Sequence, residues 1–222
     1  MIEDRGFSTV AIASVRAQAE KTRPPRALWT SAMLGRPLGE PNDPAFQRQV
    51  LMAALRLLER ADGPVVLEDF ESDPPGASDR PDWRAPNVPH DDFATELAAL
   101  MPVWEQAKAR FGRTSVGLGF QPPERWAAFT DAFLAGGLPT VSGLDTAALA
   151  LRFLCDDIKA LYGEAAQAVG PAPSAGQVDR WFWHETAAGK LLNALRLVAL
   201  ASENNALKTV GGRFFVPAIY VA

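Results

Sequence analysis

Apolar and polar positions change their period several times within the first 70 residues. Three short runs are rich in apolar and β-branched side chains, which favours strands: residues 9–13, 27–32 and 64–70. Between the second and third runs, residues 44–61 repeat apolar side chains at helical spacing, behind a natural N-cap, Asp43, and a natural first helical residue, Pro44. Strands that alternate with a helix predict a small parallel sheet of about three strands.

Beyond residue 90 the apolar side chains recur at helical spacing along most of the chain. This spacing predicts four amphipathic helices, over about residues 92–111, 122–135, 145–169 and 177–201. Residues 71–90 differ, because they contain five prolines and almost no periodicity, as a connector or an ordered crossing loop does. We therefore expect an α/β protein, with α+β as the alternative. Its expected parts are a partial α/β module (1–70), a proline-rich connector (71–90) and a bundle-like helical part (91–222).

Composition narrows the classes of partner. The 222 residues carry a net charge of -4, which gives no basic stripe for nucleic acid. The most apolar helical run, LLNALRLVALA, contains Arg196 and falls well short of a membrane span. A single cysteine, Cys155, and the absence of an export leader in MIEDRGFSTV lead us to expect a cytoplasmic protein.

The stretch GRPLGEPNDP, residues 35–44, is a proline-rich loop that leads from the second predicted strand into the helix. Open α/β sheets bind ligands where such loops leave the carboxyl ends of parallel strands, and the amides of a first helical turn attract anions. We take four residues as candidates for holding a small carboxylate-bearing ligand: Arg36, Gly39, Asn42 and Asp43. In the alternative interpretation Arg36 pairs with Glu40, and the prolines only shape a turn.

The helical part offers few groups for catalysis. His184 and Glu185 follow three aromatic residues in WFWHETAAGK, and they are the candidate catalytic pair for proton transfer. A buried, hydrogen-bonded histidine beside a surface glutamate is the simpler interpretation. Asp156 and Asp157 on another helix could meet this pair inside a bundle, but the repeated Glu-x-x-His motifs of di-metal sites are missing. No phosphate loop or nucleophile elbow is present, and we expect neither a metal nor a cofactor.

Three segments in order carry a resemblance to a known family: GFSTVAIASVRAQAEKTRPPRAL, LGRPLGEPNDPAFQRQVL and GPVVLEDF. Over about residues 1–70 the chain resembles the selenoprotein B component of glycine, sarcosine, betaine and D-proline reductases, and more broadly its uncharacterised bacterial relatives. The resemblance implies the end of a longer α/β region, in a complex that reductively cleaves a carbon–nitrogen bond. In that family the redox motif of selenocysteine or cysteine lies upstream of the matching block, whereas Cys155 lies outside the block.

Two functions follow from these observations. In the first, the chain is an accessory or non-catalytic reductase-like component that binds a reductase-type partner chain or a small anionic ligand. In the alternative, it is a stand-alone enzyme on a small amino-acid-like or organic acid, which uses Arg36 and either His184 or Glu185. A three-stranded sheet also leaves open edges. Either the chain covers them, with help from residues 71–90 and the strand-like segments 115–119 or 213–221, or a homodimer does, and we expect the homodimer.

Overall fold

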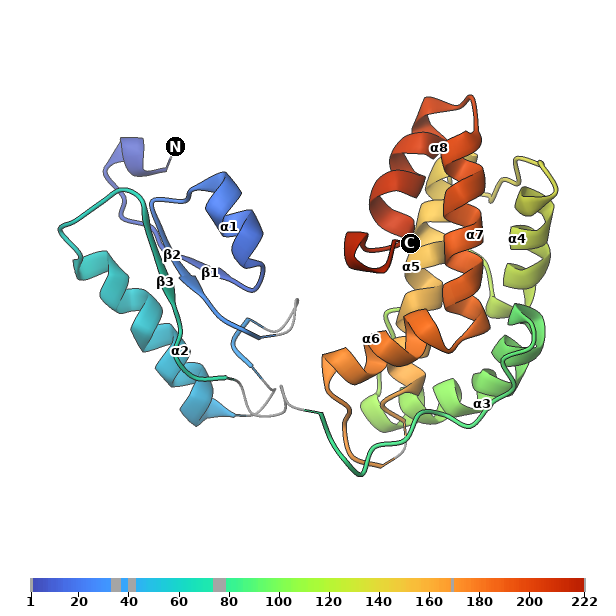
Figure 1. Ribbon diagram of the computed structural model, residues 1–222, viewed down its shortest axis with the longest axis horizontal. Helices are drawn as coiled ribbons and strands as arrows, with labels where there is room; N and C mark the ends of the chain where they lie inside the picture. The colour runs from blue at the N-terminus through green and yellow to red at the C-terminus, as the bar shows by residue number, and fades with distance from the viewer. Residues whose placement is uncertain (1, 33–36, 40–42, 74–78, 169, 222) are drawn as a thin grey trace. The chain divides into compact units, whose positions relative to one another are not determined.

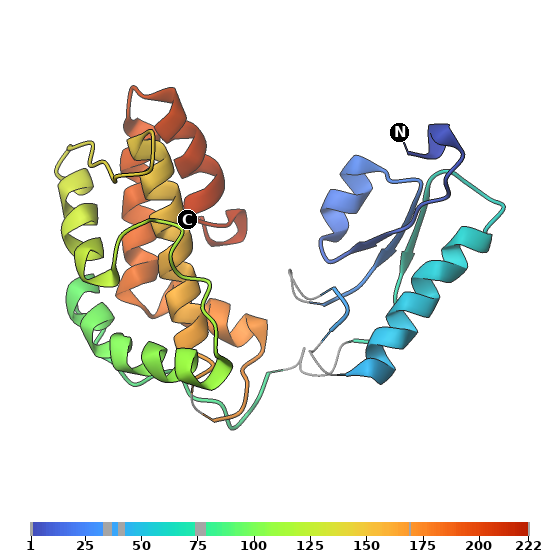
Figure 2. The same ribbon diagram turned by 180° about the vertical axis from the view of Figure 1, so that it is seen from behind.

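The computed structural model describes residues 2–32, 37–39, 43–73, 79–168 and 170–221. It divides into two compact units, Met1–Asp79 and Arg80–Ala222, and each is described by itself. The first holds the sheet and the second holds most of the helices, as seen from two sides in Figures 1 and 2. Within the described residues, no helix is long and apolar enough to cross a membrane.

The first unit contains a parallel sheet in the order β1-β2-β3, which confirms the predicted sheet. The strands are β1 (Ala11–Ala13), β2 (Arg26–Trp29) and β3 (Val66–Asp69), and the helices are α1 (Arg16–Thr22) and α2 (Pro44–Arg56). In register, Ala11 lies opposite Ala27, and Ala27 lies opposite Leu67. The strands are shorter than the apolar runs that predicted them, and the remaining residues of those runs lie in the connecting loops.

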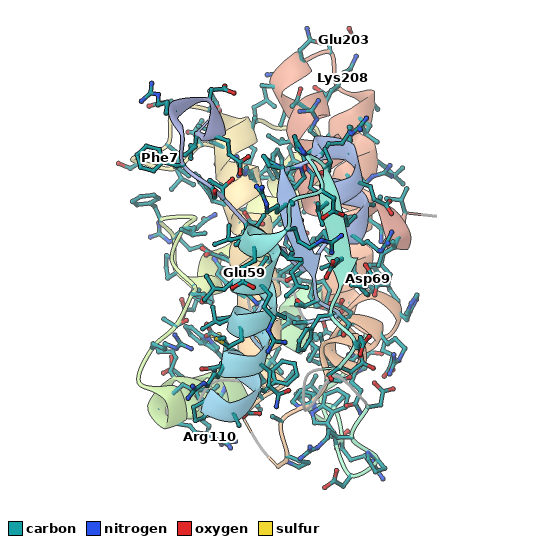
Figure 3. All side chains as sticks on the ribbon, turned by 90° about the vertical axis from the view of Figure 1, so that its left-hand side faces the viewer. Phe7, Glu59, Asp69, Arg110, Glu203 and Lys208 are labelled. Carbon is teal, nitrogen blue, oxygen red and sulfur yellow. The ribbon has the colours of Figure 1, made fainter. Side chains whose placement is uncertain are left out.

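The two faces of this sheet carry different partners. Helix α2 buries Phe46, Val50 and Ala54 against Leu28 and Val66, and α1 lies on the other side of the sheet (Figure 1). Successive side chains of β3 follow the same alternation: Glu68 contacts Arg60, which follows α2, and Asp69 contacts Arg16 of α1. Asp69 lies at the carboxyl end of β3 (Figure 3), so this end of the sheet is polar on both faces.

The second unit is a bundle around α5, which confirms the helical part predicted from sequence. Its helices are α3 (Phe93–Phe111), α4 (Trp126–Leu134), α5 (Ala147–Ala165), α6 (Ala175–His184), α7 (Ala187–Ala201) and α8 (Asn205–Val210). The single helix expected over 177–201 was wrong, because the chain breaks at Glu185 and Thr186 caps α7 by accepting from the Gly189 amide. A Cβ at Gly189 would lie 2.2 Å from the Phe182 carbonyl oxygen, so α6 and α7 meet at van der Waals contact.

Residues 80–90 belong to the second unit. The Trp83 side chain is buried in the core of the bundle, and its Nε1 donates to the Ala166 carbonyl at 3.1 Å. The Arg80 amide also donates to the Gln177 side chain at 2.8 Å. These contacts attach the second half of the proline-rich stretch to α5 and α6.

The two strand-like segments in the helical part are not strands. Residues 115–119 form a loop whose amides bind side chains of α5. The chain end forms a π-helix (Gly211–Phe215) and a 3-10 turn (Ala218–Tyr220), and the Phe215 and Val216 side chains are buried in the bundle. The Tyr220 ring stacks on Trp183, with centroids 5.4 Å apart. Phe215, Val216 and Tyr220 therefore pack within their own unit, whereas the side chains of Leu118 and Ile219 are exposed.

Candidate binding groove

The predicted ligand loop is described in part. Arg36 and Asn42 lie outside the described residues. Gly39 adopts φ +80°, a left-handed conformation that favours glycine and turns the chain before α2. The Asp43 carboxylate accepts from the Phe46 amide at 3.0 Å, so this side chain caps the first turn of α2. Gly39 and Asp43 thus shape the loop and start the helix.

A groove of about 540 Å³ lies beside this loop, between α2 and the carboxyl end of β3. One wall is a stripe along α2, formed by Ala45, Arg48, Gln49, Met52, Ala53 and Arg56. The other wall is the continuous run from Glu68 to Ser72, and Leu28 of β2 completes the lining. The α2 stripe lies next to the face that Phe46 and Val50 bury against the sheet, Ala53 belongs to both, and the Met52 side chain is 44% exposed. The groove is therefore open to solvent at the sheet end where α/β proteins bind ligands.

The charges in the groove are unequally matched. Glu68 contacts Arg60, and the Asp69 carboxylate accepts from the Arg16 Nε at 3.1 Å. Three groove-lining charges have no partner in the described part of the chain: the guanidinium groups of Arg48 and Arg56, and the carboxylate of Glu71. Two guanidinium groups on one helical stripe are thus available for an anionic group in the groove. The predicted helix contained both arginines, but its sequence does not show which flank faces β3.

The candidate catalytic pair lies in the second unit, at the end of α6. His184 and Glu185 are both exposed, so the expectation of a buried histidine was wrong. His184 is the last residue of α6, where the chain turns towards α7, and its ring contacts the Tyr220 ring at 5.7 Å. Among the described residues, neither side chain makes a hydrogen bond or an ion pair. The geometry therefore gives this pair no oriented partner for proton transfer.

The α5 carboxylate that might have met His184 is engaged elsewhere. Asp157 is fully buried, and it accepts from the amides of Gly117, Leu118 and Gly119 at 2.9, 2.9 and 2.8 Å. Its neighbour Asp156 forms an ion pair with Lys159 at 2.8 Å. In the parts of the chain that the structure describes, no group of three or more metal-ligating side chains could hold an ion. Asp157 therefore anchors a loop.

A second buried carboxylate was not found from the sequence. Glu96 of α3 accepts from the Ala187 and Ala188 amides at 2.8 and 3.0 Å, and from the Tyr162 hydroxyl at 2.7 Å. Its Oε2 also contacts Nδ1 of His90. Burial and the Glu96 carboxylate raise the pKa of Tyr162. The group joins α3, α5 and the first turn of α7.

Cys155 is fully buried in α5, and burial raises the pKa of its thiol to about 12 from an ordinary 9.0. Because the folded chain holds this proton more tightly than the unfolded chain, its contribution to stability is complete below about pH 9 and is lost between pH 9 and 12. Between pH 9 and 12 the unfolding free energy should decrease with pH less steeply in Cys155→Ala than in the unmodified chain, by up to about 1.4 kcal/mol per pH unit. Urea unfolding from pH 8 to 11 measures both slopes, and equal slopes would contradict the prediction.

Comparison of the chain with protein-family models, with curated proteins and with solved structures gave no match.

Proposed function

We propose that the protein is an accessory, non-catalytic reductase-like component, and that its first unit binds a small anionic ligand or a partner chain in the groove beside β3. The observation that carries the proposal is the pair of arginines, Arg48 and Arg56, which face the groove with no carboxylate partner among the described residues. The likeness of residues 1–70 to the selenoprotein B component supports the reductase-like part. The alternative, a stand-alone enzyme, gains less support because His184 and Glu185 are exposed and make no described hydrogen bond.

Binding in the groove depends on the two arginines. We expect Arg48→Ala and Arg56→Ala each to weaken the binding of small carboxylates by about tenfold, since each removes a charge-assisted hydrogen bond. Isothermal titration calorimetry with glycine, sarcosine, betaine and acetate measures the affinity. Both residues are exposed, so the melting temperature should stay close to that of the unmodified chain.

Arg5→Ala is the matched control, because Arg5 is an exposed arginine of the same unit that does not line the groove. It should leave the affinity unchanged. If all three variants bind these carboxylates as the unmodified chain does, Arg48 and Arg56 do not form the site.

The homodimer expected from the sequence stays a prediction. The open sheet edges that motivated it are present in the described part of the chain, where β1 and β3 each pair with β2 alone. We expect light scattering at micromolar concentration to give the mass of two chains. A monodisperse monomer of 23.9 kDa would contradict it.

A further inference from the structure

Among the described residues, the outer edge of β3 pairs with no further strand. The Val66 amide donates to the Pro25 carbonyl at 3.0 Å, and the Phe70 amide donates to the Trp29 carbonyl at 2.8 Å. Amides of a strand point alternately to its two sides, so those of Leu67 and Asp69 point away from β2. In the described ranges, neither amide has a hydrogen-bond partner. This edge can accept a further strand.

The groove reaches the carboxyl end of this edge, where Glu68 and Asp69 line it and Leu67 does not. Five consecutive residues, from Glu68 to Ser72, line it, although their side chains alternate between the two faces of the sheet. This wall consists of the last two residues of β3 and the three residues that follow them, and Leu28 of β2 completes the lining. The facing wall is the flank of α2. A strand edge opposite a helix is the geometry in which an extended peptide adds to a sheet, with the helix contacting every second side chain.

Spacing and charge select the peptide. Arg48 and Arg56 are eight residues apart, which at the α-helical rise of 1.5 Å is about 12 Å. Side chains four residues apart on one face of an extended strand are about 13 Å apart. Between the two arginines lies the exposed Met52 side chain. Two acidic side chains four residues apart, with an apolar side chain midway, therefore match the wall of α2. On the facing wall, Glu68 pairs with Arg60 and Asp69 with Arg16, whereas Glu71 keeps a negative charge without a partner among the described residues.

We propose that the groove takes an extended segment of a partner protein, with the pattern acidic-x-apolar-x-acidic, as a fourth strand beside β3. Its backbone pairs with the outward groups of Leu67 and Asp69. Its acidic side chains bind Arg48 and Arg56, and its apolar side chain contacts Met52. The proposal rests on the function proposed above, because it names what occupies the same groove.

The test uses the full chain and a fluorescein-labelled nine-residue peptide with glutamate at its third and seventh positions, valine at its fifth and threonine elsewhere. Fluorescence anisotropy should show saturable binding, which Arg48→Ala and Arg56→Ala each weaken about tenfold and Arg5→Ala leaves unchanged. A peptide with lysine in place of both glutamates should not bind. Equal binding of the glutamate and lysine peptides would overturn the charge pairing.

Backbone pairing is tested on the peptide, so that no protein variant can fail to fold. Methylation of one alternate set of its amide nitrogens should abolish binding, and methylation of the other set should leave it intact, because only one edge of the peptide faces β3. If both methylated peptides bind, no strand is added. Binding of the peptide should slow hydrogen exchange at the backbone amides of Leu67 and Asp69. If both amides already exchange slowly in a dimer without peptide, a second copy of the chain covers this edge and the proposal is overturned.

Calorimetry with the small carboxylates separates the two proposals. If they bind through Arg48 and Arg56 while the peptide does not, the strand proposal fails and the proposed function stands. If neither binds, both fail.

Discussion

The Asp157→Ala variant is expected to lose about 3–5 kcal/mol of unfolding free energy. Asp157 is 0% exposed and accepts three amide hydrogen bonds from Gly117, Leu118 and Gly119. Its removal leaves these donors with no protein acceptor, and it opens a void under the loop. We expect urea unfolding monitored by circular dichroism to show a lower midpoint. Amide exchange should be fastest for residues 115–119.

Asp156→Ala is the matched control for this variant. Asp156 precedes Asp157 on α5, carries the same charge and is half-exposed, and its ion pair with Lys159 is worth about 0.2–1 kcal/mol at most. A general loss of helical or electrostatic stability would affect both variants alike. A similar small loss for Asp157→Ala and Asp156→Ala would show that the loop holds its position without the buried carboxylate.

The local sequence pattern predicts those helices and strands whose signals come from residues close together in the chain. The strand runs predict β1, β2 and β3 because their apolar side chains are close in sequence, and the caps Asp43 and Asp92 mark the starts of α2 and α3. Each cap acts within one helical turn, at distances that a sequence window covers. The fold class follows from these local signals.

The break between α6 and α7 was missed for a physical reason. The apolar residues before and after Glu185 both suit one long amphipathic stripe, so the period of the pattern gives no sign of the turn. The turn depends on Thr186 acting as an N-cap and on the close approach that Gly189 permits. Thr186 three residues before Gly189 was the local signal for this N-cap.

The candidate site was also predicted only in part from the sequence. The sequence placed a candidate ligand loop at the carboxyl end of β2, and the described groove begins at Ala45, just after that loop. The cations of the groove, Arg48 and Arg56, were not selected, because only the packing of α2 on the sheet shows which flank faces β3. The role of Asp157 could not be found from the sequence, because its amide donors are 38 to 40 residues away in the chain.

Glu96→Gln is the second variant with a large expected loss, about 3 kcal/mol. The Glu96 carboxylate accepts from two backbone amides of α7 and from the Tyr162 hydroxyl. In the variant, the glutamine side chain has an NH₂ donor in place of one of the two carboxylate oxygens. That donor would face the amide of Ala187 or Ala188, which is also a donor. The negative charge at the first turn of α7 is lost as well. Chemical unfolding measured with Trp fluorescence reports the loss.

Glu105→Gln is the matched control, because Glu105 lies on the same helix, α3, but is exposed and pairs with Lys108. We expect a change within about 0.5 kcal/mol. Tyr162→Phe removes one of the donors to Glu96, and on its own it should cost about 1–2 kcal/mol. In the double variant with Glu96→Gln that cost should be smaller, because the hydroxyl no longer serves a carboxylate. Strict additivity of the two losses would mean that Glu96 and Tyr162 contribute to stability independently.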